Sequence, residues 1–179
     1  DPTEGAILSC AAKINIWKKG LEDRFPFIEE IPFDSERKKM TIVRRDNNMV
    51  IAFIKGAPDI FLEDCVQIED ALGARKLEDV DKKEILAVNE KLASSAMRVL
   101  AIGYKNMDKV PDSYGAEAIE KDMVFLGLVA MIDPAREEVK DAIEKCSTAG
   151  IKTVMITGDH RNTAVAIAKE LGFFKEGSM

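Results

Sequence analysis

The chain has few of the residues that usually carry out catalysis or hold metals. It contains a single histidine, His160, and three cysteines, Cys10, Cys65 and Cys146, with no CxxC pair. Each cysteine sits where an apolar residue would fit, which indicates buried, reduced thiols and a cytosolic setting. The motifs GxxxxGK[ST], GxGxxG and HExxH are absent. No Ser/His/Asp arrangement can be assembled either, so His160 is interpreted as a partly exposed turn residue, and no metal site is predicted.

Long apolar runs are also missing. The longest, Met123 to Ile132, has the length of a strand, and a membrane helix needs about 18 apolar residues. With no signal peptide either, no insertion of this segment into a membrane is predicted. The net charge of −6 argues against nucleic acid or an anionic membrane surface as the main partner. A small anionic ligand remains compatible, because it responds to a local cluster of positive groups.

What is present suits a packed core, since 46% of the 179 residues are hydrophobic. Apolar residues at helical spacing predict a helix over residues 3–17, with Trp17 in the core. Residues 40–45 and 49–55 are typical of two strands of a hairpin. The following segments are predicted in turn: a short helix from Pro58 through Asp64, a mobile polar loop over 69–83, a helix from Ile85 to about Ala96, a strand over 98–104, and an irregular stretch over 107–121.

The pattern then changes to that of a parallel sheet. A strand over 124–132 precedes Asp133, which can cap a helix that ends at Gly150. An apolar strand over 151–157 and a further helix that stops at Gly172 complete a β-α-β-α series. The sequence thus predicts an α+β fold: an antiparallel sheet flanked by helices in a domain over residues 1–132, and part of a parallel α/β domain over 133–179.

Two strand ends carry residues suited to an anionic ligand. At the first, the Thr157, Gly158 and Asp159 turn offers a hydroxyl, backbone N–H groups and close backbone approach, although the same three residues also make plain turns. At the second, Lys55 ends a mostly apolar strand and Gly56 follows it. A lysine there favours a bound anion or a paired carboxylate; the alternative is a lysine whose stem packs while its ammonium reaches solvent.

An aromatic residue precedes a basic cluster in the Phe33 to Met40 stretch. An exposed Phe33 ring could stack on a nucleic base, whereas a buried ring would simply belong to the core. Arg98 begins a predicted strand, where its guanidinium suits bidentate contact with phosphate or a surface pair with an acid.

The order of these signals resembles the cytosolic nucleotide-binding region of P-type cation-transporting ATPases, and most of all their calcium-transporting branch. The resemblance covers essentially the whole chain. It rests on six stretches: Asp1-Pro2-Thr3-Glu4, Phe33 to Met40, Lys55-Gly56-Ala57-Pro58, Met97-Arg98-Val99-Leu100, Asp133-Pro134-Ala135-Arg136 and Met155 to His160.

The resemblance implies a role for each matching residue. Glu4 would touch the adenine edge, Phe33 would stack on the adenine, and Lys38 and Lys55 would line the pocket beside Gly56. The remaining residues would serve the phosphates and the domain hinge: Arg98 toward the phosphates, Asp133 and Arg136 at the hinge between the nucleotide-binding and phosphorylation domains, and Thr157, Gly158 and Asp159 around the terminal phosphate and its Mg²⁺.

Some positions depart from the family pattern. Ala135 replaces the second proline common in the hinge motif, Asp59 stands where glutamate is usual, and Ser35 stands where an arginine often helps to hold the nucleotide. The family's Asp-Lys-Thr-Gly-Thr segment, whose aspartate accepts the phosphoryl group, and its Gly-Asp-Gly segment are not in the sequence. Together with the helix-start signature at Asp1, this predicts that both ends are cut points within a longer polypeptide.

The implied parent is an integral membrane pump that couples ATP hydrolysis to cation transport through an aspartyl-phosphate. This soluble segment, at the cytoplasmic face, would bind ATP with Mg²⁺ and be inactive alone, and residues 133–179 would belong to a haloacid-dehalogenase-like phosphorylation domain. Its partners would be the remaining phosphorylation, actuator and transmembrane domains. Two alternatives are open: a soluble phosphatase of the haloacid-dehalogenase-like class, and a standalone nucleotide-sensing module.

Overall fold

The computed structural model describes residues 2–95, 97–107, 115–132, 136–156, 161–172 and residue 174, with the side chains of 161–163 left out. The chain divides into two compact units. Unit 1 comprises residues 1–87 and 99–129, and unit 2 comprises 88–98 and 130–179. The fold is α+β, as the sequence predicted, with helices flanking a seven-stranded sheet.

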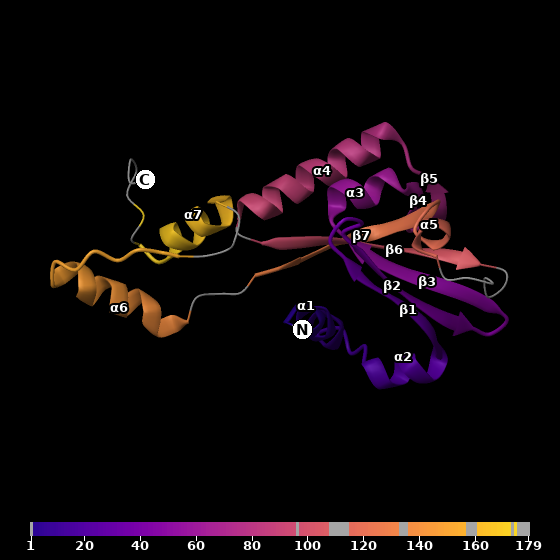
Figure 1. Cartoon of the computed structure of the whole chain (residues 1–179), viewed down its shortest axis with the longest axis horizontal. Helices are drawn as coiled ribbons and strands as arrows, with labels where there is room; N and C mark the ends of the chain where they lie inside the picture. Colours follow the sequence, from indigo (N-terminus) through magenta and orange to yellow (C-terminus); the bar gives the residue numbers. More distant parts are fainter. Residues whose placement is uncertain are drawn as a thin grey trace. The chain divides into compact units, whose positions relative to one another are not determined.

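The strands of the sheet lie in the order β1-β2-β3-β6-β7-β4-β5 (Figure 1). Their bounds are Phe27–Asp34 for β1, Lys39–Asp46 for β2, Met49–Gly56 for β3, Cys65–Asp70 for β4, Gly73–Lys76 for β5, Arg98–Met107 for β6 and Met123–Met131 for β7.

The sheet is mixed rather than purely antiparallel. The neighbours β1–β2, β2–β3 and β3–β6 pair antiparallel, as do β4 and β5. However, β4 pairs parallel with β7, and Ile68 lies opposite Phe125. Parallel neighbours need a long crossover connection. Along the sequence, that connection contains β5, the next helix and β6. The sequence did not predict β4 as a strand, which is why this parallel pair was missed.

The β2–β3 hairpin forms where its residue pattern predicts it. Asn47 adopts a left-handed φ of 53° in the connecting turn, a conformation that asparagine tolerates well. The two strands alternate buried and less buried positions, so that Val43, Ala52 and Ile54 face the core. Thr41 and Lys39 of β2 are also buried, and polar groups in such positions require partners.

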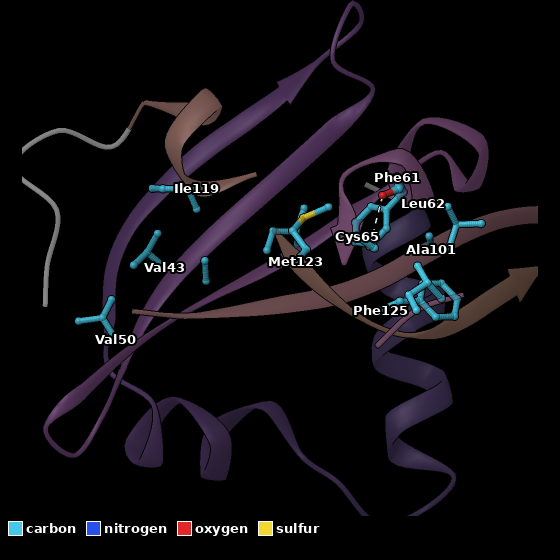
Figure 2. Packing of buried hydrophobic residues seen from close by; sticks show 12 residues of the cluster. Val43, Val50, Phe61, Leu62, Cys65, Ala101, Ile119, Met123 and Phe125 are labelled. Carbon is cyan, nitrogen blue, oxygen red and sulfur yellow. Dashed lines mark hydrogen bonds between the residues drawn. The ribbon is translucent and has the colours of Figure 1, made fainter. Parts of the chain in front are cut away.

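Short helix α3 (Pro58–Glu63) begins at its proline, as expected, and supplies the largest fully buried side chain, Phe61. Figure 2 shows Phe61 and Leu62 near Cys65, whose thiol donates a hydrogen bond to the Phe61 carbonyl. Gly103 of β6 makes room for this packing, because a Cβ there would lie 3.0 Å from the Phe61 ring. The core cluster of unit 1 comprises Val43, Val50, Ala52, Ile54, Phe61, Leu62, Cys65, Leu77, Ala101, Ile119, Met123 and Phe125.

The expected N-terminal helix over residues 3–17 is wrong in length and in burial. Helix α1 covers Pro2–Ala12, Asn15 has a left-handed φ of 57°, and a second helix, α2, covers Lys18–Arg24. The left-handed residue ends the first helix because it cannot continue the right-handed hydrogen-bond ladder. Trp17, expected in the core, precedes α2 and is 64% exposed. Cys10 is exposed as well, so among the cysteines only Cys65 is fully buried.

The polar stretch 69–83 is ordered rather than a mobile loop. It holds the β4–β5 hairpin and the start of helix α4 (Asp79–Ser94). Arg75 of β5 joins these elements, because its guanidinium donates hydrogen bonds to both carboxylate oxygens of Asp81. This fork lowers the pKa of Asp81 to about 2. Local charge pairing thus gives structure to a segment that has too few apolar residues to be recognised by hydrophobic pattern.

Helix α5 (Ala116–Ile119) breaks the stretch expected to be irregular and leads into β7. Its last residue, Ile119, is buried, as is Met123 at the start of β7. These two anchors fix the connection between them, in which Asp122 takes a left-handed φ of 53°.

Unit 2 contains α6 (Glu137–Thr148) and α7 (Arg161–Glu170), which end at Gly150 and Gly172 in left-handed conformations as predicted. Residues 151–156, expected as a strand, are not one. An apolar segment becomes a strand only when neighbouring backbone groups complete its hydrogen bonds, and no described strand pairs with it. Its side chains are correspondingly exposed, Val154 by 71% and Ile156 by 94%.

Candidate functional site

The turn between β1 and β2 is built by one aspartate. The carboxylate of Asp34 accepts hydrogen bonds from the backbone N–H groups of Glu36 and Arg37, each at 2.9 Å. These bonds, led by that from Arg37, lower the pKa of Asp34. Its carbonyl accepts a third bond from the Lys38 N–H at 2.7 Å. The sequence Asp-Ser-Glu-Arg-Lys thus closes a compact turn through local contacts.

The same turn is held against the end of β3 through backbone contact. Lys38 has a left-handed φ of 50°, and its carbonyl accepts a hydrogen bond from the Ala57 N–H at 3.1 Å. Gly56 is what permits this approach, because a Cβ at that position would lie 2.7 Å from the Lys38 carbonyl oxygen. The sequence suggested that Gly56 admits a ligand. In the structure, the space beside its Cα is filled by the turn itself.

Phe33 lies one residue before this turn, at the end of β1, and 64% of its surface is exposed. The register between β1 and β2 shifts between Ile31 and Asp34, so Phe33 sits at an irregular point of the ladder. Phe61, in contrast, is fully buried. Of the two interpretations open from the sequence, the exposed aromatic surface is the one realised, and the core role is wrong.

Lys55, the last lysine of β3 before Gly56, forms an ion pair with Glu4 of α1. Burial lowers the pKa of Lys55. Two residues predicted to serve one nucleotide pocket, from opposite ends of the first 55 positions, are therefore in direct contact. A partly desolvated cation of this kind is suited to binding a further anionic oxygen.

A second basic group in the turn is buried and fully engaged. Lys39, 5% exposed, pairs with Asp64 at the end of α3, and the same carboxylate also pairs with Lys121. Burial opposes ionisation of Asp64, but the two ammonium groups outweigh it and lower the pKa of its carboxyl. These contacts attach the turn to the end of α3 and to Lys121. Sequence reasoning missed them because all three partners look like surface residues.

The structure brings five of the predicted site residues together in unit 1. Glu4 contacts Lys55, Gly56 follows in the same strand, the Lys38 backbone packs on Gly56, and Phe33 immediately precedes the turn that contains Lys38. Arg98, at the start of β6, and Arg136, at the N-terminus of α6, belong to unit 2. The remaining predicted residues, Asp133, Thr157, Gly158 and Asp159, lie outside the described residues, as does His160.

The described parts of the chain hold neither a metal site nor a membrane-spanning helix. No group of three or more His, Cys, Asp or Glu residues there is arranged to hold a metal ion. Within the same residues, no helix has both the length and the apolarity required for crossing a membrane. The grouped features are therefore an exposed aromatic ring, two lysines and a glutamate around a tightly packed turn.

This combination of fold and site agrees with a family match. Residues 1–138 match the family described as P-type ATPase, cytoplasmic domain N. The chain belongs to this family, and the resemblance inferred from its six sequence stretches is confirmed.

Several proteins similar to the chain are named as calcium-transporting ATPases. The chain is 42% identical over 98% of its length to calcium-transporting ATPase 1 of Bacillus cereus, and 45% identical over 96% to the calcium-transporting ATPase of Bacillus subtilis. It is 40% identical over its full length to calcium-transporting ATPase 1 of Lactococcus lactis. The matches cover 20%, 19% and 20% of those proteins, so the chain spans about a fifth of their length.

Proposed function

We propose that this chain is the ATP-binding part of a P-type ATPase that transports calcium across a membrane through an aspartyl-phosphate intermediate. The single observation that carries the nucleotide-binding assignment is the Glu4–Lys55 ion pair beside the exposed Phe33 and the β1–β2 turn. An exposed aromatic ring next to partly desolvated positive charge is what an adenine with a phosphate tail requires. The calcium assignment is supported by the similarity to calcium-transporting ATPases.

Each residue of the group takes a defined role in this proposal. The Phe33 ring stacks on the adenine, and Glu4 accepts a hydrogen bond from the exocyclic amine of the base. Lys38 and Lys55 line the nucleotide pocket. The exposed side chain of Lys38 makes no hydrogen bond or ion pair with any described residue, so it has no competing partner in that part of the chain. Arg98 extends the positive surface toward the phosphates.

The remaining residues act on the transferring group. Thr157, Gly158 and Asp159 close around the terminal phosphate and its Mg²⁺, and Asp133 and Arg136 form the hinge that lets the two domains meet. The sequence contains no Asp-Lys-Thr-Gly-Thr segment. The nucleophilic aspartate is therefore supplied by the rest of the polypeptide, together with the actuator and transmembrane domains. This chain binds ATP at the cytoplasmic face of the membrane but does not hydrolyse it alone.

A titration of the chain with ATP tests the proposal. In amide NMR spectra recorded with and without Mg²⁺, resonances of residues 33–38 and 55–57 should shift in a saturable manner. Titration with GTP is the matched control, because its base presents a carbonyl where adenine has an amine, and Glu4 would lose its hydrogen bond. Weaker GTP binding is expected. If ATP shifts only resonances near His160 and none near Phe33, the adenine-pocket assignment is wrong.

A further inference from the structure

Arg37 links the β1–β2 turn to a buried carboxylate. Its guanidinium donates hydrogen bonds from Nη1 to both carboxylate oxygens of Glu120, each at 2.5 Å. From Nη2 it donates to the backbone carbonyl of Pro32 at 2.9 Å. Arg37 therefore joins one buried carboxylate to the peptide group that immediately precedes Phe33.

Glu120 is a fixed anchor for this contact. It is 3% exposed and lies next to Ile119, which is 1% exposed, in the connection from α5 to β7. One of its carboxylate oxygens also accepts a hydrogen bond from the Thr41 hydroxyl of β2 at 2.8 Å. This oxygen thus has two partners, Thr41 and Arg37, and Arg37 also bonds to the other oxygen. The Glu120 carboxylate therefore cannot rotate without breaking a buried hydrogen bond.

The three consecutive basic residues of the turn are divided between two tasks. Arg37 pairs with Glu120, and Lys39 pairs with Asp64, so both point to buried carboxylates. Lys38 lies between them, with a left-handed backbone and an exposed side chain. Buried carboxylates hold the side chains of both neighbouring residues. The side chain of Lys38 therefore points away from the core.

Stability alone is a weak reason for such an arrangement. Desolvating two charges costs about as much as their attraction returns, so a well-packed apolar pair would stabilise the fold equally well. An ion pair does differ from an apolar pair in its directionality, since the planar guanidinium fixes the orientation as well as the distance of its partners. Arg37 uses Nη1 for Glu120 and Nη2 for the Pro32 carbonyl, which fixes the backbone on one side of Phe33, and the hydrogen bonds of Asp34 fix it on the other.

We infer that the Arg37–Glu120 pair is a positioning device that sets the orientation of Phe33 and Lys38 for the nucleotide, without touching the nucleotide itself. This inference rests on the proposed function for its ligand. Its structural content, the ordering of the turn by a carboxylate 83 positions away in the sequence, is independent of that proposal. Phe33 stacking and Lys38 direction should thus respond to a change at Glu120.

Binding measurements with Arg37→Met, Glu120→Gln and the double variant test the pair. Each single variant should raise the Kd for ATP and the Kd for adenosine, each by roughly threefold to tenfold. The loss for adenosine reports the placement of Phe33, because adenosine has no phosphate, and any larger loss for ATP reports the direction of Lys38. The double variant should show no further loss. It also removes both charges at once, which keeps the test valid if Arg37→Met leaves Glu120 unpaired and unfolds the chain.

Arg75→Met is the matched control. Arg75 also donates hydrogen bonds to both oxygens of a carboxylate, that of Asp81, but it lies on β5, at the opposite edge of the sheet from β1. This variant should leave both Kd values unchanged. Amide ¹⁵N relaxation without nucleotide provides a second readout. Residues 35–38 should become more mobile in Arg37→Met and Glu120→Gln, and should be unaffected in Arg75→Met.

Three results would overturn the inference. Loss of ATP affinity with unchanged adenosine affinity would mean that Arg37 binds phosphate directly. Unchanged Kd values in Glu120→Gln, with loss in Arg37→Met, would remove Glu120 from the device. Unchanged relaxation of residues 35–38 in all variants would remove the ordering itself. If the unmodified chain binds neither ligand, the proposed function fails, while the relaxation measurement still decides whether the pair orders the turn.

Discussion

At the scale of single residues, Phe33 and Phe61 show that two residues of the same type can have unrelated tasks. Phe61 is fully buried among apolar side chains, whereas Phe33 leaves 64% of its surface exposed beside a basic turn. Removing a buried phenylalanine usually costs about 3–5 kcal/mol of stability. An exposed ring has little to lose in the free protein, so its value is realised only when a ligand covers it.

Phe33→Ala should therefore weaken nucleotide binding without weakening the fold. Stacking of a base on an aromatic ring contributes about 1–3 kcal/mol, so the Kd for ATP should rise by about 5- to 150-fold. Calorimetric titration measures the Kd, and thermal unfolding measures stability. Phe61→Ala is the control, with a large loss of stability. A drop in the unfolding temperature of Phe33→Ala as large as that of Phe61→Ala would instead assign Phe33 to the core.

Gly56 is a residue whose importance comes from a neighbouring backbone. Gly56→Ala should lower both stability and ATP affinity, because its Cβ would lie 2.7 Å from the Lys38 carbonyl oxygen and must displace the turn. Thermal unfolding and ATP titration measure the two effects. Gly20→Ala in α2 is the matched control: nothing lies within 4 Å of the added carbon, and alanine is the better helix former by about 0.5–1 kcal/mol. Equal behaviour of the two variants would contradict the close-approach explanation.

At the scale of elements, the β1–β2 turn depends on contacts of two kinds. Its shape comes from local hydrogen bonds, which the Asp34 carboxylate accepts from the N–H groups two and three residues further along the chain. Its attachment comes from α3 and from the α5–β7 connection, through Lys39–Asp64 and Arg37–Glu120. The local bonds are of a kind that sequence patterns indicate. The long-range pairs depend on β2, α3 and β7 reaching one place.

The attachment through Asp64 should make stability sensitive to acid. The paired ammonium groups lower the pKa of Asp64 against the effect of burial. The charged carboxylate therefore stabilises the fold above its unfolded pKa of about 3.9, and this contribution is lost as the pH falls through the lower, folded pKa. Denaturant unfolding of Asp64→Asn against the unmodified chain should show a stability difference that is constant near neutral pH and shrinks below about pH 4.

Asp59→Asn is the control for that measurement. Asp59 lies on α3, the helix that Asp64 caps, but it is exposed and pairs with no described cation. Its substitution should give a small difference with little pH dependence in the same range. A stability difference for Asp64→Asn that stays constant down to pH 2 would show that the ion pairs with Lys39 and Lys121 do not stabilise the fold.

At the scale of the whole molecule, the two units differ in how well they bury apolar side chains. Every member of the core cluster lies between Val43 and Phe125, in unit 1. In unit 2, Ile151, Val154 and Ile156 are 59%, 71% and 94% exposed. Ile151 and Val154 border an open cavity of about 880 Å³ between α6, residues 151–155 and α7. Unit 1 thus has a closed core, and unit 2 retains an uncovered apolar surface.

Residues 1–132 alone should therefore keep their fold and their affinity for ATP. The measurements are thermal unfolding, an amide NMR spectrum and ATP titration, each compared with the 179-residue chain. The shortened chain should also bind less of a hydrophobic fluorescent dye such as ANS, because the exposed side chains of residues 151–156 are removed. Loss of cooperative unfolding on truncation would contradict this division and would place part of the essential core in the last 47 residues, 133–179.

The sequence by itself determined the features that depend on neighbours along the chain. These include the β2–β3 hairpin, the start of α3 at Pro58, the glycine stops of α6 and α7, and the family, through six short ordered stretches. Periodicity and turn chemistry are local, so they are readable without tertiary structure. The same reasoning failed for Trp17, because a helical apolar pattern shows that a face is apolar and not that another element covers it.

Only the tertiary structure decided which residues meet. It placed β4 parallel to β7, brought Glu4 to Lys55, filled the space at Gly56 with the Lys38 backbone, and buried Glu120 beneath Arg37. It also left residues 151–156 without a strand partner among the described residues, although their composition favours a strand. The physical reason is the same in each case: long-range contacts and strand pairing depend on where distant segments converge, and no local pattern encodes that position.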